Sequence, residues 1–217
     1  MRIIIIGARE DGHARVVLDA VRAASEYTIT GFVDDDQSLH GEDVLGVPVL
    51  GSVAQISTFR SLFDVAIVAI GDNTARMNIS MKLAQLSIPL VTVVHPRAVV
   101  AGDVRLGAGT FVAAGAVIST GTVVGKCVII NTSATVDHDS IISDYVHIGP
   151  GVHAAGRVFV GQCSFLGIGS RVIPDVTIGT NVIIGAGAVV LKNVPDGATC
   201  VGVPARVIKL NGVPVDG

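Results

Sequence analysis

The stretch that decides the fold is VGKCVI INTSAT VDHDSI ISDYVH, residues 124–147. Divided into sixes, it places Val or Ile first in every hexad and a small or β-branched residue fifth. The register runs without a slip from Val94 to Val194, and sixteen of its seventeen first places hold Val, Leu or Ile. A six-residue period is typical of a short strand followed by a corner, with three strands in each coil. It predicts a parallel β-solenoid of between five and six coils in residues 94–217, which end in a short C-terminal extension.

Residues 1–93 follow a different pattern, in which apolar runs of strand length alternate with helical spacing. Strands are expected at residues 2–6, 29–33, 65–70 and 90–94, and helices at residues 14–24 and 74–87, the second capped by Thr74. Alternating strands and helices indicate a parallel sheet with right-handed crossovers. The region is therefore predicted to be an α/β domain of βαβ type, a truncated Rossmann-like fold too short for a full dinucleotide-binding domain.

The composition limits the classes of partner. The net charge is -3 and no basic run occurs, so neither nucleic acid nor an anionic membrane surface is expected as a partner. No apolar stretch reaches the roughly 18 residues of a membrane span, and the N-terminus lacks the features of a signal peptide. Cys127 and Cys163 share a hexad place two coils apart, about 9.6 Å, which exceeds the reach of a disulfide. These features favour a cytoplasmic protein with free thiols.

Several short motifs are more specific than the hexads. They are Gly12-His13-Ala14, Gly31-Phe32-Val33-Asp34-Asp35-Asp36, Ala69-Ile70-Gly71-Asp72-Asn73, Asn131-Thr132, Asp137-His138-Asp139, Val146-His147-Ile148-Gly149-Pro150-Gly151 and Gly202-Val203-Pro204-Ala205-Arg206. With them, the whole chain resembles the hexapeptide-repeat sugar acetyltransferases of the sialic acid O-acetyltransferase and bacillosamine-pathway type. The resemblance implies a left-handed parallel β-helix and a homotrimer with active sites between subunits.

The same resemblance implies an acyltransferase with acetyl-CoA as cosubstrate. The expected reaction is N-acetylation of a nucleotide-linked amino sugar, commonly a 4-amino-6-deoxy sugar, for surface glycan or glycoprotein synthesis. O-acetylation of a sialic-acid-like sugar is the alternative within this class, and a non-catalytic trimeric binding or scaffold protein is the alternative outside it. No metal is expected, because the spacings of nine and six between His138, His147 and His153 do not suit a zinc site on this fold.

Three residues are candidates for the chemistry of acetyl transfer. His138 stands at the third place of its hexad, outside the inward aliphatic register, and a histidine there can act as the general base. The resemblance assigns Asp139 to orient its imidazole. Gly156 follows His138 by 18 residues, one coil, so its backbone N–H is placed about 4.8 Å along the axis from the base. That N–H is a candidate donor to the oxyanion.

Other residues are expected to bind the substrates. The resemblance favours His147 as a substrate contact, and Asn131 can hydrogen-bond the substrate or form a ladder within the coil. In the N-terminal domain, residues 1–93, the nucleotide sugar is expected at Gly7, Gly12, His13, Asp34, Asp35, Gly71 and Asn73. The loop before His13 is two residues longer than is usual in the family and brings Glu10 and Asp11 to where a phosphate is expected.

CoA is expected to lie along the solenoid axis because it is long and its thioester must reach Gly156. The small residues and backbone that offer clearance in the later coils are Gly167, Ile168, Gly185 and Ala186. The cations proposed for the CoA phosphates, beyond the last hexad, are Arg206 and Lys209.

Overall fold

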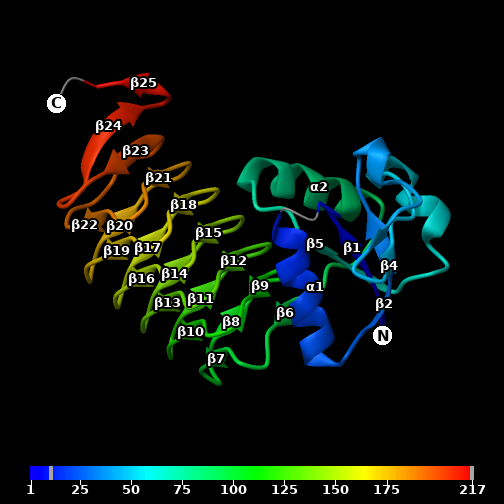
Figure 1. Cartoon of the computed structure of the whole chain (residues 1–217). Coiled ribbons are helices and arrows are strands. Elements are labelled where there is room, and N and C mark those ends of the chain that lie inside the picture. Colours follow the sequence, from blue (N-terminus) through cyan, green and yellow to red (C-terminus); the bar gives the residue numbers. More distant parts are fainter. Residues whose placement is uncertain (10–11, 216–217) are drawn as a thin grey trace. The chain divides into compact units, whose positions relative to one another are not determined.

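The computed structural model describes residues 1–9 and 12–215, and the chain divides into two compact units, Met1–Pro96 and Arg97–Gly217 (Figure 1). Unit 1 is an α/β domain and unit 2 is a parallel β-solenoid. Both predicted architectures are confirmed.

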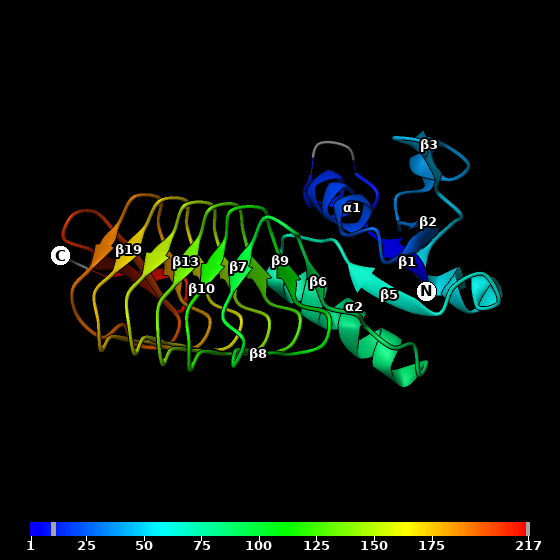
Figure 2. The same cartoon turned by 90° about the horizontal axis from the view of Figure 1, so that it is seen from below.

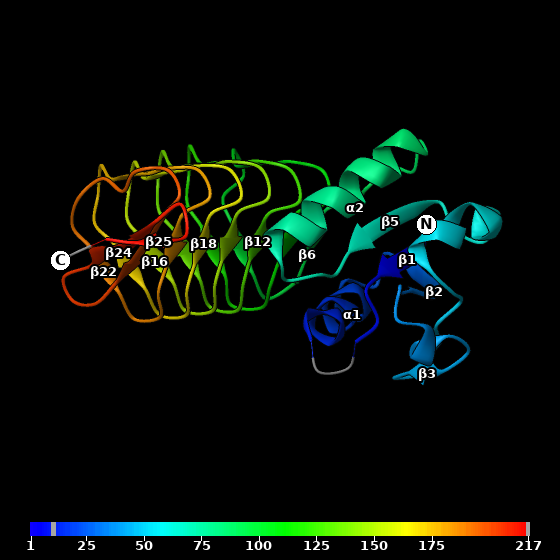
Figure 3. The ribbon, with the colours of Figure 1, turned by 90° about the horizontal axis from the view of Figure 1, so that it is seen from above.

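Unit 1 is built on a three-stranded parallel sheet. The strand order is β2 (Thr28–Val33), β1 (Arg2–Ile6) and β5 (Val65–Val68), so β1 is central and fully flanked. Helices α1 (His13–Ala24) and α2 (Asn73–Gln85) lie on opposite faces of this sheet (Figures 2 and 3). The run of isoleucines in β1 is buried throughout, as expected of a central parallel strand covered on both faces.

The remaining elements of unit 1 are short. They are the 3-10 helices η1 (Gln37–Leu39) and η2 (Val53–Phe59), the antiparallel pair β3 (Asp43–Val44) and β4 (Val47–Pro48), and β6 (Val93–Val94). The expected strand at residues 90–94 is reduced to β6 and a single bridge between Leu90 and Ala66. The predicted cap at Thr74 is wrong. Asp72 is the N-cap of α2, and its Oδ1 accepts a hydrogen bond from the Ala75 N–H at 2.8 Å.

Unit 2 contains three parallel sheets of two-residue strands, wound as a left-handed β-helix (Figure 2). Sheet 1 contains β7 (Val99–Val100), β10 (Val117–Ile118), β13 (Thr135–Val136), β16 (His153–Ala154), β19 (Arg171–Val172) and β22 (Val189–Val190). Sheet 2 contains β8 (Arg105–Leu106), β11 (Val123–Val124), β14 (Ile141–Ile142), β17 (Phe159–Val160) and β20 (Thr177–Ile178). Sheet 3 contains β9 (Phe111–Val112), β12 (Ile129–Ile130), β15 (His147–Ile148), β18 (Phe165–Leu166) and β21 (Ile183–Ile184). Residues of successive strands pair with the residue 18 positions later, as the period predicts, up to the last coil, where Ile183 pairs with Thr199, 16 positions later.

The solenoid core consists of the first-place aliphatic residues, which are buried from Val112 to Val190. The fifth-place residues beside them are also buried from Thr110 onward, and four of them, Thr110, Thr122, Ser140 and Ser164, have hydroxyls that donate to a carbonyl of the next coil. In one example, Ser164 Oγ donates to Gly179 O at 2.7 Å and accepts from the Val182 N–H at 2.9 Å. Thr110 and Ser140 make the equivalent bonds. Small polar residues are therefore tolerated at the tight corners, because the next coil provides hydrogen-bond partners for their hydroxyls.

The corners between sheets are four residues long and are named here after the sheet that precedes them. Corner 1 follows sheet 1 and includes residues 119–122, 137–140, 155–158 and 173–176, whereas corner 3 follows sheet 3 and includes residues 131–134, 149–152, 167–170 and 185–188. The solenoid ends in β23 (Ala198–Val201), β24 (Arg206–Leu210) and β25 (Val213–Pro214), of which the last two run antiparallel. Within the described residues, neither α-helix has the length and apolarity needed to cross a bilayer.

Candidate active site

His138 and Asp139 form an ion pair or hydrogen-bonded pair at corner 1, directly after β13. His138 Nδ1 lies 2.9 Å from Asp139 Oδ2, and the two side chains are 42% and 62% exposed. The His138 N–H also donates to Asp137 Oδ1 at 2.8 Å, which fixes the start of the corner. With Nδ1 protonated and donating to Asp139, Nε2 is left as the basic nitrogen of the imidazole.

Gly156 lies under the imidazole of His138, one coil along the axis. A Cβ at position 156 would lie 2.5 Å from His138 Nε2 and 2.7 Å from Cε1. Within the described part of the chain, the Gly156 N–H has no hydrogen-bond acceptor, whereas the next N–H, of Arg157, donates to His138 O at 2.8 Å. The structure therefore brings the predicted base, its carboxylate and the predicted oxyanion donor to one corner.

The Asp139 carboxylate has room beside His138 because the residue one coil earlier is a glycine. Asp139 has φ 58°, in the left-handed region that Asp tolerates better than most residues. Gly121, one coil earlier, has φ 72°, and a Cβ there would overlap Asp139 Oδ1. The Gly121 N–H donates to Asp103 Oδ2 at 2.9 Å. The hydrogen bond from the Thr120 hydroxyl and, after it, the one from Gly121 lower the pKa of Asp103.

A groove of about 520 Å³ runs along the outer face of sheet 1 and reaches corner 1. Its polar lining includes Thr135, Asp137, His153 and Arg171, and Thr135 Oγ1 lies 3.0 Å from His153 Nδ1. His153 was not among the predicted substrate contacts, although its place one coil above Thr135 follows from the same 18-residue register. An elongated substrate can lie in this groove with one end at the His138 corner.

Asn131 and His147 form a second cluster, on sheet 3 and corner 3. Asn131 Nδ2 lies 3.1 Å from His147 Nε2, and the His147 ring packs edge-on against Phe165 with 5.1 Å between centroids. The Asn131 amide is oriented by the Thr132 N–H, which donates to its Oδ1 at 2.8 Å. In one chain this cluster lies on a different sheet and corner from His138.

The residues expected to contact CoA do not lie together in one chain. Gly167, Ile168, Gly185 and Ala186 lie on corner 3, and the coils approach so closely there that a Cβ at Gly167 would lie 2.7 Å from Ile184 O. Arg206 lines a groove of about 370 Å³ that also includes Lys192, whereas Lys209 is not among its lining residues. Lys192 was not among the predicted residues, although it lies three coils, 54 residues, after His138 in the same column.

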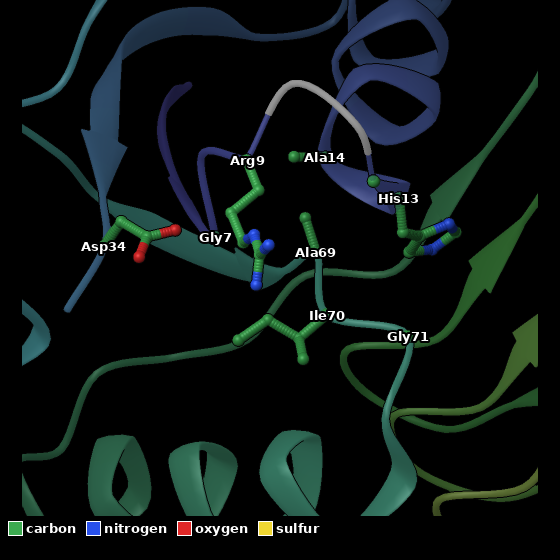
Figure 4. A pocket seen from close by; sticks show the side chains of 9 residues that line it. Gly7, Arg9, His13, Ala14, Asp34, Ala69, Ile70 and Gly71 are labelled. Carbon is green, nitrogen blue, oxygen red and sulfur yellow. The ribbon is translucent and has the colours of Figure 1, made fainter. Parts of the chain in front are cut away.

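Unit 1 carries its own pocket, of about 310 Å³, at the carboxyl ends of its strands (Figure 4). Five predicted residues line it, and they are Gly7, Gly12, His13, Asp34 and Gly71. Figure 4 shows that Arg9, Ala69 and Ile70 line it as well. The pocket opens at the start of α1, where Gly12 provides no side-chain cap. A helix N-terminus without such a cap can receive a phosphate. Glu10 and Asp11 lie outside the described residues.

Asp34 organises this pocket from within. Its Oδ2 accepts from the Ala8 N–H at 2.7 Å and its Oδ1 from the Asp36 N–H at 2.9 Å, so it joins the loop after β1 to the loop after β2. Asp35 is directed elsewhere, because its Oδ1 accepts from the Val53 N–H at the start of η2. Asp35 is not among the residues that line the pocket.

Buried Arg76 supports the other side of the pocket. Its Nη1 donates to Ile70 O at 3.0 Å and to Gly71 O at 3.1 Å, and its Nη2 donates to Asn73 Oδ1 at 2.7 Å. Asn73 is thus bound to Arg76 and does not line the pocket. Arg76 had no signal in the sequence, since it stands on a helix with no marked apolar face.

Comparison with known proteins places the chain in a family. The model of the PglD N-terminal domain matches residues 2–83, and that of the bacterial transferase hexapeptide repeats matches residues 157–192. A GDP-perosamine N-acetyltransferase of Escherichia coli O157:H7 is 33% identical over 193 residues, which cover 85% of this chain and 84% of the relative.

Two solved structures are similar along almost the whole chain. PerB from Caulobacter crescentus, in complex with CoA and GDP-perosamine, is 42% identical with a TM-score of 0.89, over 95% of this chain and 97% of the other. The acetyltransferase domain of PglB from Neisseria gonorrhoeae, in complex with acetyl coenzyme A, is 35% identical with a TM-score of 0.88, over 95% and 98% of the two chains. The protein is therefore an acyltransferase and belongs to the hexapeptide-repeat sugar acetyltransferase family.

Proposed function

We propose that the protein transfers the acetyl group of acetyl-CoA to the amino group of a nucleotide-linked amino sugar, of the 4-amino-6-deoxy class. The observation that carries this proposal is the His138–Asp139 pair above Gly156, in a chain that aligns along 95% of its length with a structure holding CoA and GDP-perosamine. The product would serve the synthesis of a surface glycan or glycoprotein.

The reaction would proceed by direct attack. The sugar amine attacks the thioester carbonyl carbon, and Nε2 of His138 takes the proton that the amine loses. The Gly156 N–H donates to the oxygen of the tetrahedral species, which collapses as the C–S bond breaks and the CoA sulfur receives a proton. Asp139 holds the imidazole in the required tautomer and stabilises the imidazolium. No covalent bond to the protein is required.

The pocket of unit 1 is the proposed site for the nucleotide. Its 310 Å³ volume is within the range of small-ligand pockets. The Arg9 guanidinium and the start of α1 supply positive charge for the diphosphate, and the Asp34 backbone and carboxylate lie where a ribose is commonly bound in α/β sheets.

We further infer a homotrimer with the active site between subunits. Within one chain, His138 lies at corner 1 whereas Asn131, His147 and the corner-3 glycines lie on another sheet and corner. A second copy would bring the two sets together across an interface. A cytoplasmic location is also proposed, since free cysteines at positions 127, 163 and 200 suit a reducing compartment.

A turnover screen tests the reaction and the acceptor together. The purified protein is incubated with acetyl-CoA and with GDP-, UDP- and dTDP-linked 4-amino sugars, beside free sialic acid, and products are detected by mass spectrometry. We expect a mass gain of one acetyl group on a nucleotide-linked amino sugar, abolished in His138→Ala. Acetylation of sialic acid alone would favour the O-acetyl alternative, and absence of any product with bound CoA would contradict the proposed acceptor.

A further inference from the structure

The third residues of corner 1 form a charged column beside the proposed base. They recur every 18 residues as Asp103, Gly121, Asp139, Arg157, Asp175 and Asn193. Those at positions 121, 139, 157 and 175 share a left-handed backbone with φ between 58° and 72°. Since they have the same conformation and stack in register, Arg157 is about equally distant, roughly 4.8 Å between backbones, from the carboxylate residues on either side.

Arg157 is nevertheless bound to only one of these carboxylates. Its Nε donates to Asp175 Oδ1 at 2.6 Å and its Nη2 to Asp175 Oδ2 at 2.8 Å. Asp139, the other neighbour, is instead bound through Oδ2 to His138 Nδ1 at 2.9 Å. The bidentate pair raises the pKa of Arg157 and lowers that of Asp175, and Asp139 adds a smaller effect on Arg157. Each carboxylate therefore has one cationic or donor partner.

We propose that Asp175 is a positioning residue for acetyl transfer, because it keeps the Arg157 guanidinium away from Asp139 so that Asp139 remains bound to His138. The proposal rests on the proposed role of His138 as the base. A guanidinium forms a stronger bidentate bond to a carboxylate than an imidazole N–H does. Without Asp175, Arg157 would turn to Asp139 and displace the His138 ring, which would then lose its fixed tautomer.

The charged side chains around His138 show which cation competes with its imidazole for the Asp139 carboxylate. Asp137 accepts from the His138 N–H, the other charged side chains near it at corner 1 are Asp103, Asp139, Arg157 and Asp175, and Arg171 lies in the groove. Among them, Arg157 is the cation adjacent to Asp139 in the column. The side chains of Arg157 and Asp175 are 50% and 62% exposed, so their ion pair contributes little to folding and its loss leaves the coil intact.

The test compares Asp175→Asn with the double variant Asp175→Asn/Arg157→Gln. We expect Asp175→Asn to lower kcat about tenfold with little change in KM for either substrate, since only the base is disturbed. The double variant should regain most of this loss, because the competing guanidinium has been removed. Asp144→Asn is the matched control, since it removes one carboxylate at a different corner and its amide oxygen can still accept from the Lys126 N–H.

A second readout does not depend on turnover. The ¹⁵N chemical shifts of the imidazole, assigned to His138 by their loss in His138→Gln, report which ring nitrogen carries the proton. The parent should show mainly the Nδ1–H tautomer above neutral pH, Asp175→Asn should lose that preference, and the double variant should regain it. If the parent acetylates no amino sugar, the proposed function fails while this pattern still supports the positioning role. Equal spectra for Asp175→Asn and Asp144→Asn, or no recovery in the double variant, would overturn it.

Discussion

Single side chains at the active corner depend on the residue one coil away more than on their neighbours in sequence. His138 can lie over position 156 only because that position has no Cβ, and the Asp139 carboxylate has room only because position 121 is Gly. The side chain that fits at one position therefore depends on the side chain 18 residues before or after it. This coupling makes small substitutions at the glycines informative about the base.

Gly156→Ala should reduce activity while preserving the fold. The added methyl would lie 2.5 Å from His138 Nε2, and the half-exposed imidazole would have to move, which can cost about 100-fold in kcat. Steady-state kinetics and thermal melting measure the two effects. Gly102→Ala is the control, since it occupies the same column two coils before His138 and a Cβ there has nothing within 4 Å. Equal kinetics for the two variants would contradict the proposed position of the base.

Arg76→Met should destabilise unit 1 by about 3 kcal/mol. The substitution leaves Ile70 O, Gly71 O and Asn73 Oδ1 without their buried donor, and each unmade bond of this kind carries a desolvation cost. Urea unfolding measures the loss. Arg22→Met is the matched control, because Arg22 is exposed and bonds through its side chain to one carbonyl, Leu45 O. A loss as small as in the control would show that the loop after β5 does not depend on Arg76.

Whole strands and corners were predictable to different degrees. The two-residue strands of unit 2, together with β1 and α1, follow from apolar periods that are long and regular. The β3–β4 pair and η2 were not predicted, because segments of two to seven residues have too little pattern to be distinguished from loop. The strand expected at residues 90–94 was too long, because an apolar run forms a strand only where a neighbouring strand pairs with it. In this segment the pairing is limited to β6 and to one bridge at Leu90.

Ser164 and Ser170 both occupy the fifth place of a hexad, but they differ in hydrogen bonding. Replacing each by alanine therefore shows how much the hydrogen-bonded hydroxyl adds to the stability that a small side chain alone provides. Ser164→Ala should lower stability by about 1–2 kcal/mol, because the Gly179 carbonyl and the Val182 N–H lose their partner. Ser170→Ala should be neutral or stabilising, since the buried Ser170 Oγ has no hydrogen-bond partner within the described residues. Melting temperatures of the two variants decide this. A larger loss in Ser170→Ala would contradict the expected order.

The residues proposed for the reaction are distributed over the whole molecule. One chain has the proposed base on one corner of the solenoid and the Asn131–His147 cluster on another sheet and corner, and the pocket proposed for the nucleotide is in the other unit. The proposed site would therefore combine residues from two copies of the chain, and mixed oligomers can test this.

Coexpressed His138→Ala and His147→Ala chains should complement each other. Each variant alone is expected to lose at least about tenfold in kcat. In a mixed trimer, about a third of the sites would combine an intact His138 from one subunit with an intact His147 from the next. Turnover by the purified mixed oligomer, separated by two affinity tags, measures the recovery. No activity above that of the single variants would contradict a site shared between subunits.

By itself, the sequence determined the solenoid, its register and the neighbours of His138 along the axis. A strict six-residue period leaves one way to bury the aliphatic places, so residues 18 apart must stack. Only the tertiary structure decided which partner each charged side chain takes. Asp35 turns to η2, Asn73 to Arg76, and Arg157 to Asp175 instead of Asp139. These choices depend on side-chain rotamers and on competition among nearby donors, which no period in the sequence encodes.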